Sequence, residues 1–378
     1  MTQQVQESRA IASALYPSFR KMSPYATWLP IEDMDLGVAR PSATHTLPEI
    51  EIFAQKGRFI MSDMFILKAI DLLTYASLPA IHNLLRYMKK QDLEEAHLKC
   101  RSPLAIPAWD DINPLWERIR ALCSMGLVVR NRYLPERNSW TGEKGELDHK
   151  YYYHLPAVSS QVYRTYLQDF RKKFNPTKKF LPECEIFRYV SAAYLATSML
   201  ASSFLVDAKF GYPLYIQSDR KKETVELPAV LTMNPNGKKG DEKESEVVVV
   251  DSITLSTNTN LITWDSRIDW LYRRIGELKK VYDYYAQTCR VHFIIIGEDS
   301  KGITAIRNAV FDTDPNMLRV TLFTSGAVLD DFDLANRPDK VQRSFVEFRA
   351  MREGAKTVFE FDGAVGYYWL RIEKPVAV

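Results

Sequence analysis

The sequence of 378 residues predicts an α+β fold with two folded parts, a helical module that ends in a hairpin and a larger mixed α/β domain. Two observations support this prediction. Apolar residues recur at helical spacing in three segments between residues 62 and 125, and two strand-like runs follow them. From residue 185 onward, helical segments alternate with strand-like runs, which is typical of a mixed α/β sheet.

Composition places the chain among ordinary globular proteins. Hydrophobic residues make up 46% of it, so it can bury a large core, and intrinsic disorder is excluded as its main state. The 50 basic and 47 acidic residues leave a formal charge of only +3. Because so small a net charge attracts a polyanion weakly, a nucleic-acid surface would have to be a local basic patch.

The cysteines and the apolar segments indicate a cytoplasmic protein. The four cysteines lie far apart and form no CxxC pair, so the sequence predicts neither a zinc ribbon nor a disulfide framework. The polar segment Met1 to Ser13 lacks the apolar core of a secretion signal. The uncharged segment Val190 to Val206 has only 17 residues, five of them Ser or Thr, whereas a membrane span needs about 20 apolar residues. We expect it to be a buried helix, and we expect no membrane partner.

Three helices are predicted for the first part. Ser62 or Asp63 can cap the first helix, Pro79 suits the first turn of the second, and the third begins near Asn113 and ends at Gly126. The residues expected to face the core are Phe65, Ile66, Ala69, Ile70 and Leu73; Ile81, Leu84, Leu85 and Met88; Leu115, Ile119, Leu122 and Met125.

A hairpin is predicted after the third helix. The strands are expected at Leu127 to Tyr133 and at Lys150 to Leu155, joined by a polar loop. A polar stretch, Lys89 to Asp111, lies between the second and third helices and is longer than a simple turn. Three helices and a hairpin in this order predict a winged helix-turn-helix.

Such a module places its third helix in the major groove of duplex DNA. With Leu115, Ile119 and Leu122 inward, Glu117, Arg118, Arg120, Ala121 and Ser124 are expected outside the core. From Leu115 to Lys150, basic side chains outnumber acidic ones by seven to five. The predicted DNA contacts are Arg118 and Arg120 on the helix, Arg130, Arg132, Arg137, Lys144 and Lys150 on the wing, and Arg171, Lys172 and Lys173 in the following basic segment. The alternative is a winged helix that binds only protein.

The second part has the element order of a PD-(D/E)XK nuclease core: a helix, a run of strands, a long helix and a buried strand. Such a site holds a divalent metal with an acid on one strand and an acid-x-Lys unit on the next. Ala229 and Ile253 occupy the positions where the first acid and the lysine are needed, and Asp251 alone cannot hold the metal. Asp207 with Lys209 lacks a second acid. We therefore expect a degenerate site without metal, cofactor, catalytic residue or DNA cleavage; the alternative is a metal-dependent endonuclease that uses Asp207 or Asp251.

Residues 62 to 155 and 185 to 325, about 60% of the chain, resemble the replication-relaxation family of bacterial plasmids and integrative elements. The similar segments are Ile66-Leu67 with Leu72-Leu73, Leu115 to Val129, Tyr152 to Leu155, and Val247 to Tyr285. The resemblance implies a winged helix joined to a PD-(D/E)XK-like domain that acts on plasmid DNA. Where the family usually reads Pro-Asp-Ala, this chain has Pro228-Ala229-Val230, which argues against a metal site.

The predicted organisation has five segments. An irregular arm (1–60) precedes the winged helix (61–157), a linker helix with a basic segment follows (158–184), and the nuclease-like domain comes next (185–330). The last segment (331–378) is expected to hold a charged helix and two aromatic strands, Thr357 to Asp362 and Gly366 to Ile372. The partners predicted are double-stranded DNA and either a second copy of the chain or other mobile-element proteins.

Overall fold

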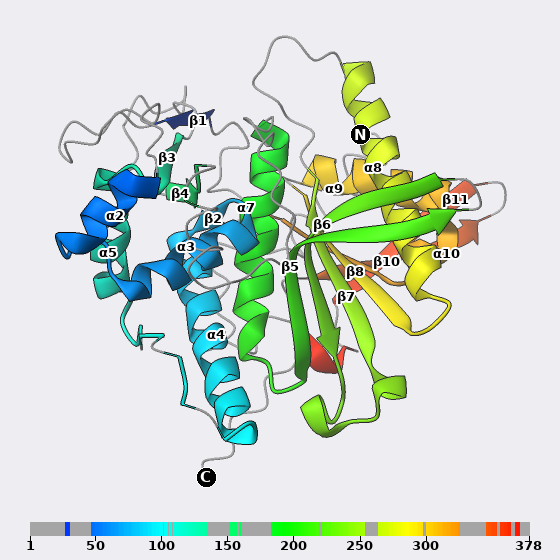
Figure 1. Cartoon of the computed structure of the whole chain (residues 1–378). Coiled ribbons are helices and arrows are strands. Elements are labelled where there is room, and N and C mark those ends of the chain that lie inside the picture. The colour runs from blue at the N-terminus through cyan, green and yellow to red at the C-terminus, as the bar shows by residue number, and fades with distance from the viewer. Residues whose placement is uncertain are drawn as a thin grey trace. The chain divides into compact units, whose positions relative to one another are not determined.

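The computed structural model describes residues 27–30, 47–100, 102–104, 106–107, 109–134, 151–156, 159, 183–218, 221–253, 264–297, 300–325, 345–353, 356–363 and 367–370. The described residues up to Ser159 belong to one compact unit, and those from Glu183 onward belong to another (Figure 1).

The first unit contains a series of helices, interrupted by a short strand and followed by a hairpin. The elements are α3 (Met61–Leu73), β2 (Ala76–Ser77), α4 (Leu78–Leu98), α5 (Ile112–Ser124), β3 (Val129–Leu134) and β4 (Tyr151–His154). A helix α2 (Leu47–Gln55) precedes them. The strand order is β1-β3-β4-β2, in which β1 (Thr27–Pro30) adds an antiparallel edge to the hairpin.

The core predicted for these helices is confirmed in large part. Every inward-facing residue named for α3 and α5 is buried, as are Ile81, Leu84 and Leu85 of α4, whereas Met88 is half-buried. Asp111 caps α5 by accepting a hydrogen bond from the backbone N–H of Asn113 at 3.1 Å, and Gly126 follows the helix with φ +69°. The N-cap of α3 is Ile60, and Asp63 contributes by accepting from the Ile60 N–H at 2.7 Å.

Two predictions for this unit were wrong. The stretch from Lys89 to Asp111 is not a loop throughout, because α4 continues through it to Leu98. The backbone returns along the helix, where Asp92 accepts from the N–H of Leu104 at 2.6 Å. Residues 1 to 60 are not irregular throughout either, since they include β1 and α2. The linker helix expected from Val158 to Phe170 lies outside the described residues, apart from Ser159.

The second unit is built on a mixed sheet of seven strands in the order β11-β10-β9-β8-β7-β6-β5. β5 (Leu205–Ser218), β6 (Lys221–Met233) and β7 (Glu246–Ser252) form an antiparallel meander. β8 (Arg290–Gly297) and β9 (Thr321–Ser325) run parallel to β7, and β10 (Val346–Glu353) with β11 (Lys356–Gly363) adds an antiparallel hairpin.

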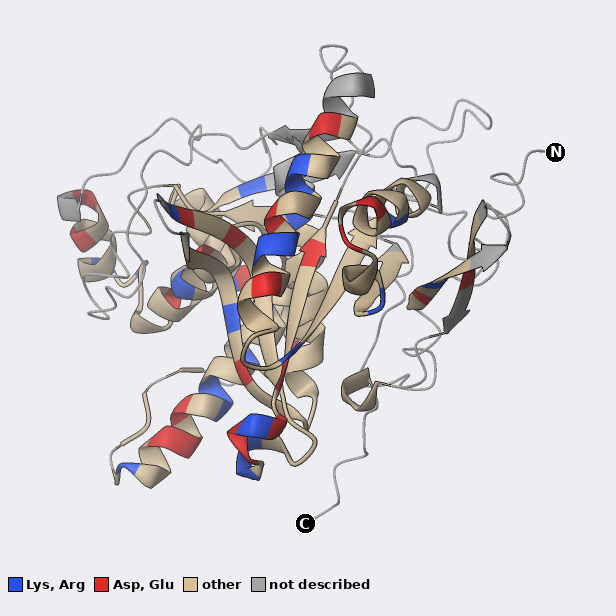
Figure 2. Cartoon of the chain, turned by 90° about the vertical axis from the view of Figure 1, so that its right-hand side faces the viewer, with Lys and Arg blue, Asp and Glu red and all other residues tan. Residues whose placement is uncertain are grey.

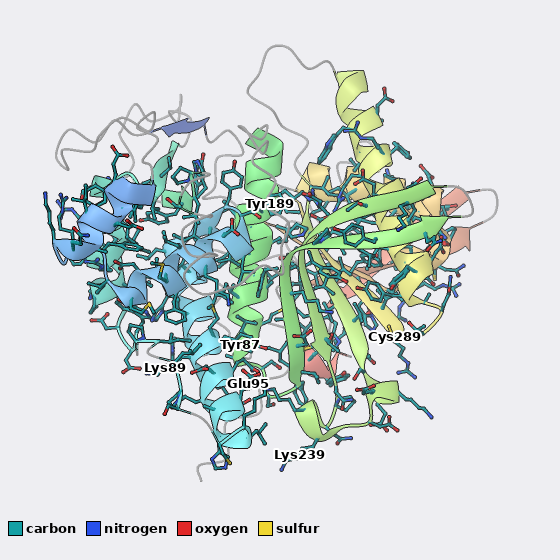
Figure 3. All side chains as sticks on the ribbon, in the orientation of Figure 1. Tyr87, Lys89, Glu95, Tyr189, Lys239 and Cys289 are labelled. Carbon is teal, nitrogen blue, oxygen red and sulfur yellow. The ribbon has the colours of Figure 1, made fainter. Side chains whose placement is uncertain are left out.

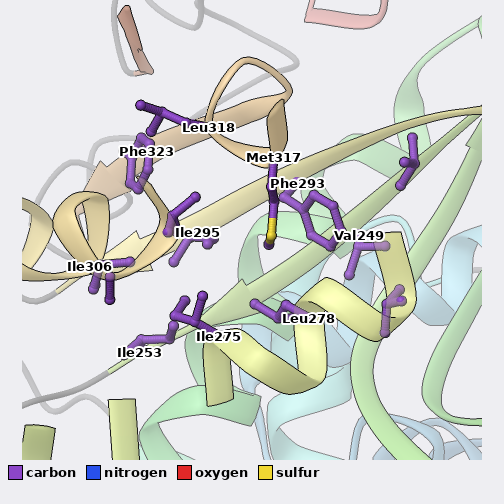
Figure 4. Close-up of a cluster of buried hydrophobic side chains, with 14 of the residues drawn as sticks. Val249, Ile253, Ile275, Leu278, Phe293, Ile295, Ile306, Met317, Leu318 and Phe323 are labelled. Carbon is purple, nitrogen blue, oxygen red and sulfur yellow. The ribbon is translucent and has the colours of Figure 1, made fainter. Parts of the chain in front are cut away.

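Helices cover both faces of this sheet. α8 (Trp264–Tyr285) joins β7 to β8, while α9 (Ser300–Thr313) and α10 (Pro315–Leu318) join β8 to β9. These helices share one apolar core with Val249, Phe293 and Phe323 of the sheet (Figure 4). Because side chains alternate along a strand, Val248 and Val250 face the other side, where α7 (Glu183–Ser198) packs on β6 and β7.

Several predictions for the second unit need correction. The sequence has two separate strand-like runs at 204–210 and 212–217, but the structure joins them in one continuous strand, β5, in which Gly211 adopts φ +50°. Where a strand was expected, from Gly366 to Ile372, the structure has a 3₁₀ turn at Tyr368–Leu370. The described residues of the last segment form a hairpin, and its strand β10 was not predicted. This hairpin extends the same sheet, so the described strands of the last segment belong to the α/β domain.

No helix of the described segments combines the length and the apolar character that crossing a bilayer requires.

Candidate functional site

The prediction that Arg118 lies on the outer surface of α5 is wrong. Its Nε donates to Asp63 Oδ1 at 2.5 Å, and its Nη2 bonds Asp63 Oδ2 and the carbonyl oxygen of Arg58, the latter at 2.6 Å. The Asp63 side chain is fully buried, and that of Arg118 is 21% exposed. Arg118 therefore joins α5 to the start of α3.

The spacing along α5 contains the signal for this inward position. Leu115, Arg118, Ile119 and Leu122 follow the i, i+3, i+4, i+7 pattern of one helix face. Arg118 and Arg120 are two positions apart, so their directions around the helix axis differ by about 160°. A single partner cannot face both side chains, which corrects the prediction that they form one contact surface.

The outward side of α5 carries few basic groups. Glu117 is exposed, and the half-buried Arg120 stacks over the ring of Trp116, with its Cζ 5.4 Å from the ring centroid. Asp110 and Asp111 are exposed just before the helix. Hydrogen bonds from the backbone N–H and side chain of Asn113 lower the pKa of Asp111, so it is charged at neutral pH. The outward side of α5 and the residues just before it thus carry one basic side chain, Arg120, and three acidic ones, Glu117, Asp110 and Asp111.

Arg130 and Arg132 lie two positions apart on β3, which is the spacing on which the prediction of a shared face rests. Arg130 is half-buried and pairs directly with Tyr153, whose side chain is 1% exposed, so both residues lie on the same face of the sheet. Arg132 pairs with Tyr151 and, on its other side, with Leu29 of β1.

The remaining predicted DNA contacts, namely Arg137, Lys144, Lys150, Arg171, Lys172 and Lys173, lie outside the described residues. Over the described part, Figure 2 shows Lys and Arg interspersed with Asp and Glu along the helices rather than gathered in one basic stripe.

A buried ionic cluster in the second unit surrounds Asp251. Its Oδ1 accepts from Arg188 Nε of α7 at 2.7 Å and from the N–H of Ser252 at 2.9 Å. Its Oδ2 accepts from Nε and Nη2 of Arg274 of α8 at 2.9 and 2.5 Å. An ionised carboxylate has about four lone-pair sites, so these four donors occupy all of them.

The cluster lies at the point where β6 and β7 stop pairing with each other. The two strands pair only as far as Ala229 with Val250, and beyond this point β6 pairs with β5 alone. The carbonyl oxygen of Glu226 accepts instead from Nη2 of Arg188 at 2.5 Å and from Nη2 of Arg274 at 3.1 Å. Arg274 also bonds Glu277. The two arginines thereby connect helices from both faces of the sheet.

Burial by itself would raise the pKa of Asp251, but the charges of Arg188 and Arg274 outweigh it and hold this pKa below its ordinary value. Asp251 is therefore unsuited to bind a metal, since its carboxylate is committed to two guanidinium groups. The sequence reasoning missed both arginines. The pattern Leu271, Arg274, Ile275, Leu278, with the spacing seen for Arg118, contains the signal for Arg274.

The other positions considered for a nuclease site are also unsuited to a metal. The side chains of Asp207 and Lys209 are about half exposed, and Lys209 Nζ lies 3.8 Å from Asp207 Oδ2. Ala229 and Ile253 are fully buried in the core. Among the residues that the structure describes, no group of three or more His, Cys, Asp or Glu side chains could hold a metal ion.

The loop between β6 and β7, which contains Lys239 (Figure 3), is built around Asn234. The Asn234 side chain donates to the carbonyl oxygen of Asp241 at 2.8 Å and accepts from the N–H of Asn236 at 2.8 Å. Since Asp241, Glu242 and Glu244 offset its three lysines, the loop has no surplus of positive charge.

Comparisons of the chain with protein-family models, with curated proteins and with solved structures give no significant match. The resemblance to the replication-relaxation family stays a prediction.

Proposed function

We propose that residues 61–157 form a winged helix-turn-helix that binds duplex DNA. The observation that carries the proposal is the topology. A helix, a strand, two helices and a hairpin follow in order, and β2 pairs with β4 of the hairpin. In such a module the third helix, here α5, enters the major groove and the hairpin lies beside it. The resemblance to mobile-element proteins supports a role in plasmid replication or transfer, or in its regulation.

Arg120, Arg130 and Arg132 are the proposed contacts among the described residues. Arg118 is excluded because its guanidinium group is committed to Asp63 and Arg58. Arg137, Lys144 and Lys150, which lie in sequence between β3 and β4, are the proposed phosphate contacts of the wing.

We further propose that the second unit is a nuclease-like domain that does not cleave DNA. The support is the carboxylate of Asp251, whose acceptor sites are filled by Arg188, Arg274 and Ser252. A phosphate-transfer metal needs carboxylate oxygens that are open to it. The unit would then serve assembly or contact with other proteins of the element.

A second candidate for the first unit is binding to a protein. The acidic residues around the start of α5 (Asp110, Asp111 and Glu117) favour it, because they repel phosphate and suit a basic protein surface.

The test is binding of the full chain to duplex DNA, measured by fluorescence anisotropy from low to physiological salt, with and without magnesium. We expect log Kd to rise linearly with log salt concentration, and the magnitude of the slope to fall by about one unit for each of Arg120, Arg130 and Arg132 that contacts phosphate when it is changed to Ala. Arg273→Ala, an exposed position on α8, is the matched control and leaves the slope unchanged. Absence of duplex binding at every salt concentration, with folding intact, would overturn the proposal in favour of the protein partner.

A further inference from the structure

We propose that α5 reads G·C base pairs through Arg120 and Glu117, and that Glu117 makes the site selective by weakening its attraction to DNA of other sequence. This inference rests on the proposed DNA-binding function and names the kind of duplex that the site takes.

The two side chains share the outward side of α5. They are three positions apart, so they lie within about 60° of each other around the helix and about 4.5 Å apart along its axis. One base-pair step of B-DNA rises about 3.4 Å. Arg120 and Glu117 can therefore reach the same base pair or two neighbouring ones.

Arg120 is oriented by its own helix. The guanidinium group stacks over Trp116 one turn earlier, with its Cζ 5.4 Å from the ring centroid. This contact restricts the side chain before DNA arrives and leaves the edges of the guanidinium plane to donate. In the major groove, a paired donor edge matches O6 and N7 of guanine.

Glu117 places a negative charge on the side of α5 that is proposed to face DNA. An exposed carboxylate repels phosphates, so it lowers affinity for every sequence unless a base donates to it. In the major groove a carboxylate commonly accepts from the N4 amino group of cytosine. Together with Asp110 and Asp111, Glu117 reduces the sequence-independent attraction. Specific contacts then decide where the protein binds.

The experiment begins with wild-type full-length protein and a randomised duplex pool, from which a preferred site is selected. We expect at least one fixed G·C pair in that site. Replacing its guanine by 7-deazaguanine removes the N7 acceptor and should weaken binding roughly tenfold or more. Replacing it by inosine keeps O6 and N7 and changes only the minor groove, so binding should stay within about twofold of the unmodified site.

Variants test the role of Glu117. Glu117→Gln should raise affinity for random duplex a few-fold and relax the preference for cytosine, while Glu51→Gln, an exposed acid on α2, should change neither. Binding without base preference, or equal binding of the 7-deazaguanine and unmodified sites, would overturn this inference while leaving DNA binding intact. Failure to bind any duplex would instead refute the proposed function.

Discussion

Arg118 of α5 and Asp63 of α3 are 55 positions apart in sequence and form a two-point ion pair inside the first unit. Asp63 also accepts from the N–H of Ile60, so one carboxylate both caps α3 and holds α5. The pair fixes how the two helices meet, and it thereby sets the direction in which the outer side of α5 points.

Removing either charge of this pair is expected to destabilise the first unit. Arg118→Ala leaves the carboxylate of Asp63 buried without its main partner, and breaking such a pair costs about 3 kcal/mol of unfolding free energy. The double variant Asp63→Leu/Arg118→Met should lose much less, because it leaves no buried charge. Urea unfolding of the full chain measures both. Lys99→Ala, which breaks the exposed pair with Glu95 at 2.6 Å, is the control and should cost less than about 1 kcal/mol. Equal costs for Arg118→Ala and Lys99→Ala would contradict this account.

Asp251→Asn is expected to lower the stability of the second unit by roughly 3–5 kcal/mol, because Arg188 and Arg274 keep their buried charges and lose the carboxylate. Since the pKa of Asp251 is depressed, its contribution is present above the ordinary aspartate pKa and is lost only as the pH falls through the lower, folded value. Thermal unfolding at pH 7 and at decreasing pH measures both effects. Magnesium- or manganese-dependent nicking of DNA that disappears in this variant would show instead that Asp251 is catalytic.

His154 should make the first unit sensitive to mild acid. Burial lowers its pKa to about 4 from an ordinary value near 6.5, and its ring packs against Tyr75 and Tyr152. Between these two values the unfolded chain binds a proton that the folded chain does not, so stability falls as the pH falls through this window. The full loss would be no more than about 3 kcal/mol.

The variant His154→Phe keeps an aromatic ring and removes the titration, so the loss of stability between pH 6.5 and pH 4 should become smaller. His97→Gln, at an exposed position on α4, should leave it as in the wild type. Urea unfolding at several pH values compares the three proteins. Identical pH profiles for wild type and His154→Phe would show that His154 is not the group responsible.

Two glycines of the second unit should respond to alanine in opposite directions. Gly237 adopts φ +58°, and an added Cβ would lie 2.7 Å from the carbonyl oxygen of Ser203, so Gly237→Ala should destabilise the loop after β6 by about 1–3 kcal/mol. Gly276 lies in α8, where an added Cβ meets nothing within 4 Å, so Gly276→Ala should stabilise by up to about 1 kcal/mol. Thermal unfolding of the two variants checks the signs, and a stabilising Gly237→Ala would refute the steric argument.

Periodicity predicted the helices of both units well, because Leu115, Ile119 and Leu122 must share one face whatever surrounds them. It predicted charged residues poorly. Arg118, Arg188 and Arg274 were missed as buried groups because a charge is stable inside only beside a partner, and Asp63 and Asp251 are far away in sequence. Strand β10 was missed for a related reason. Its sequence includes the charged residues Glu347 and Arg349, and the ladder with β9 and β11 makes it a strand.

The central claim, that the outward side of α5 faces duplex DNA, can be tested by position-specific photo-crosslinking. A benzophenone amino acid placed at Ala121 of α5 should crosslink to a bound duplex, and the same group at the exposed Arg273 of α8 should not. Salt that dissociates the complex should abolish the crosslink. Crosslinking that is equal at both positions, or absent at Ala121 while the protein still binds the duplex, would contradict the account.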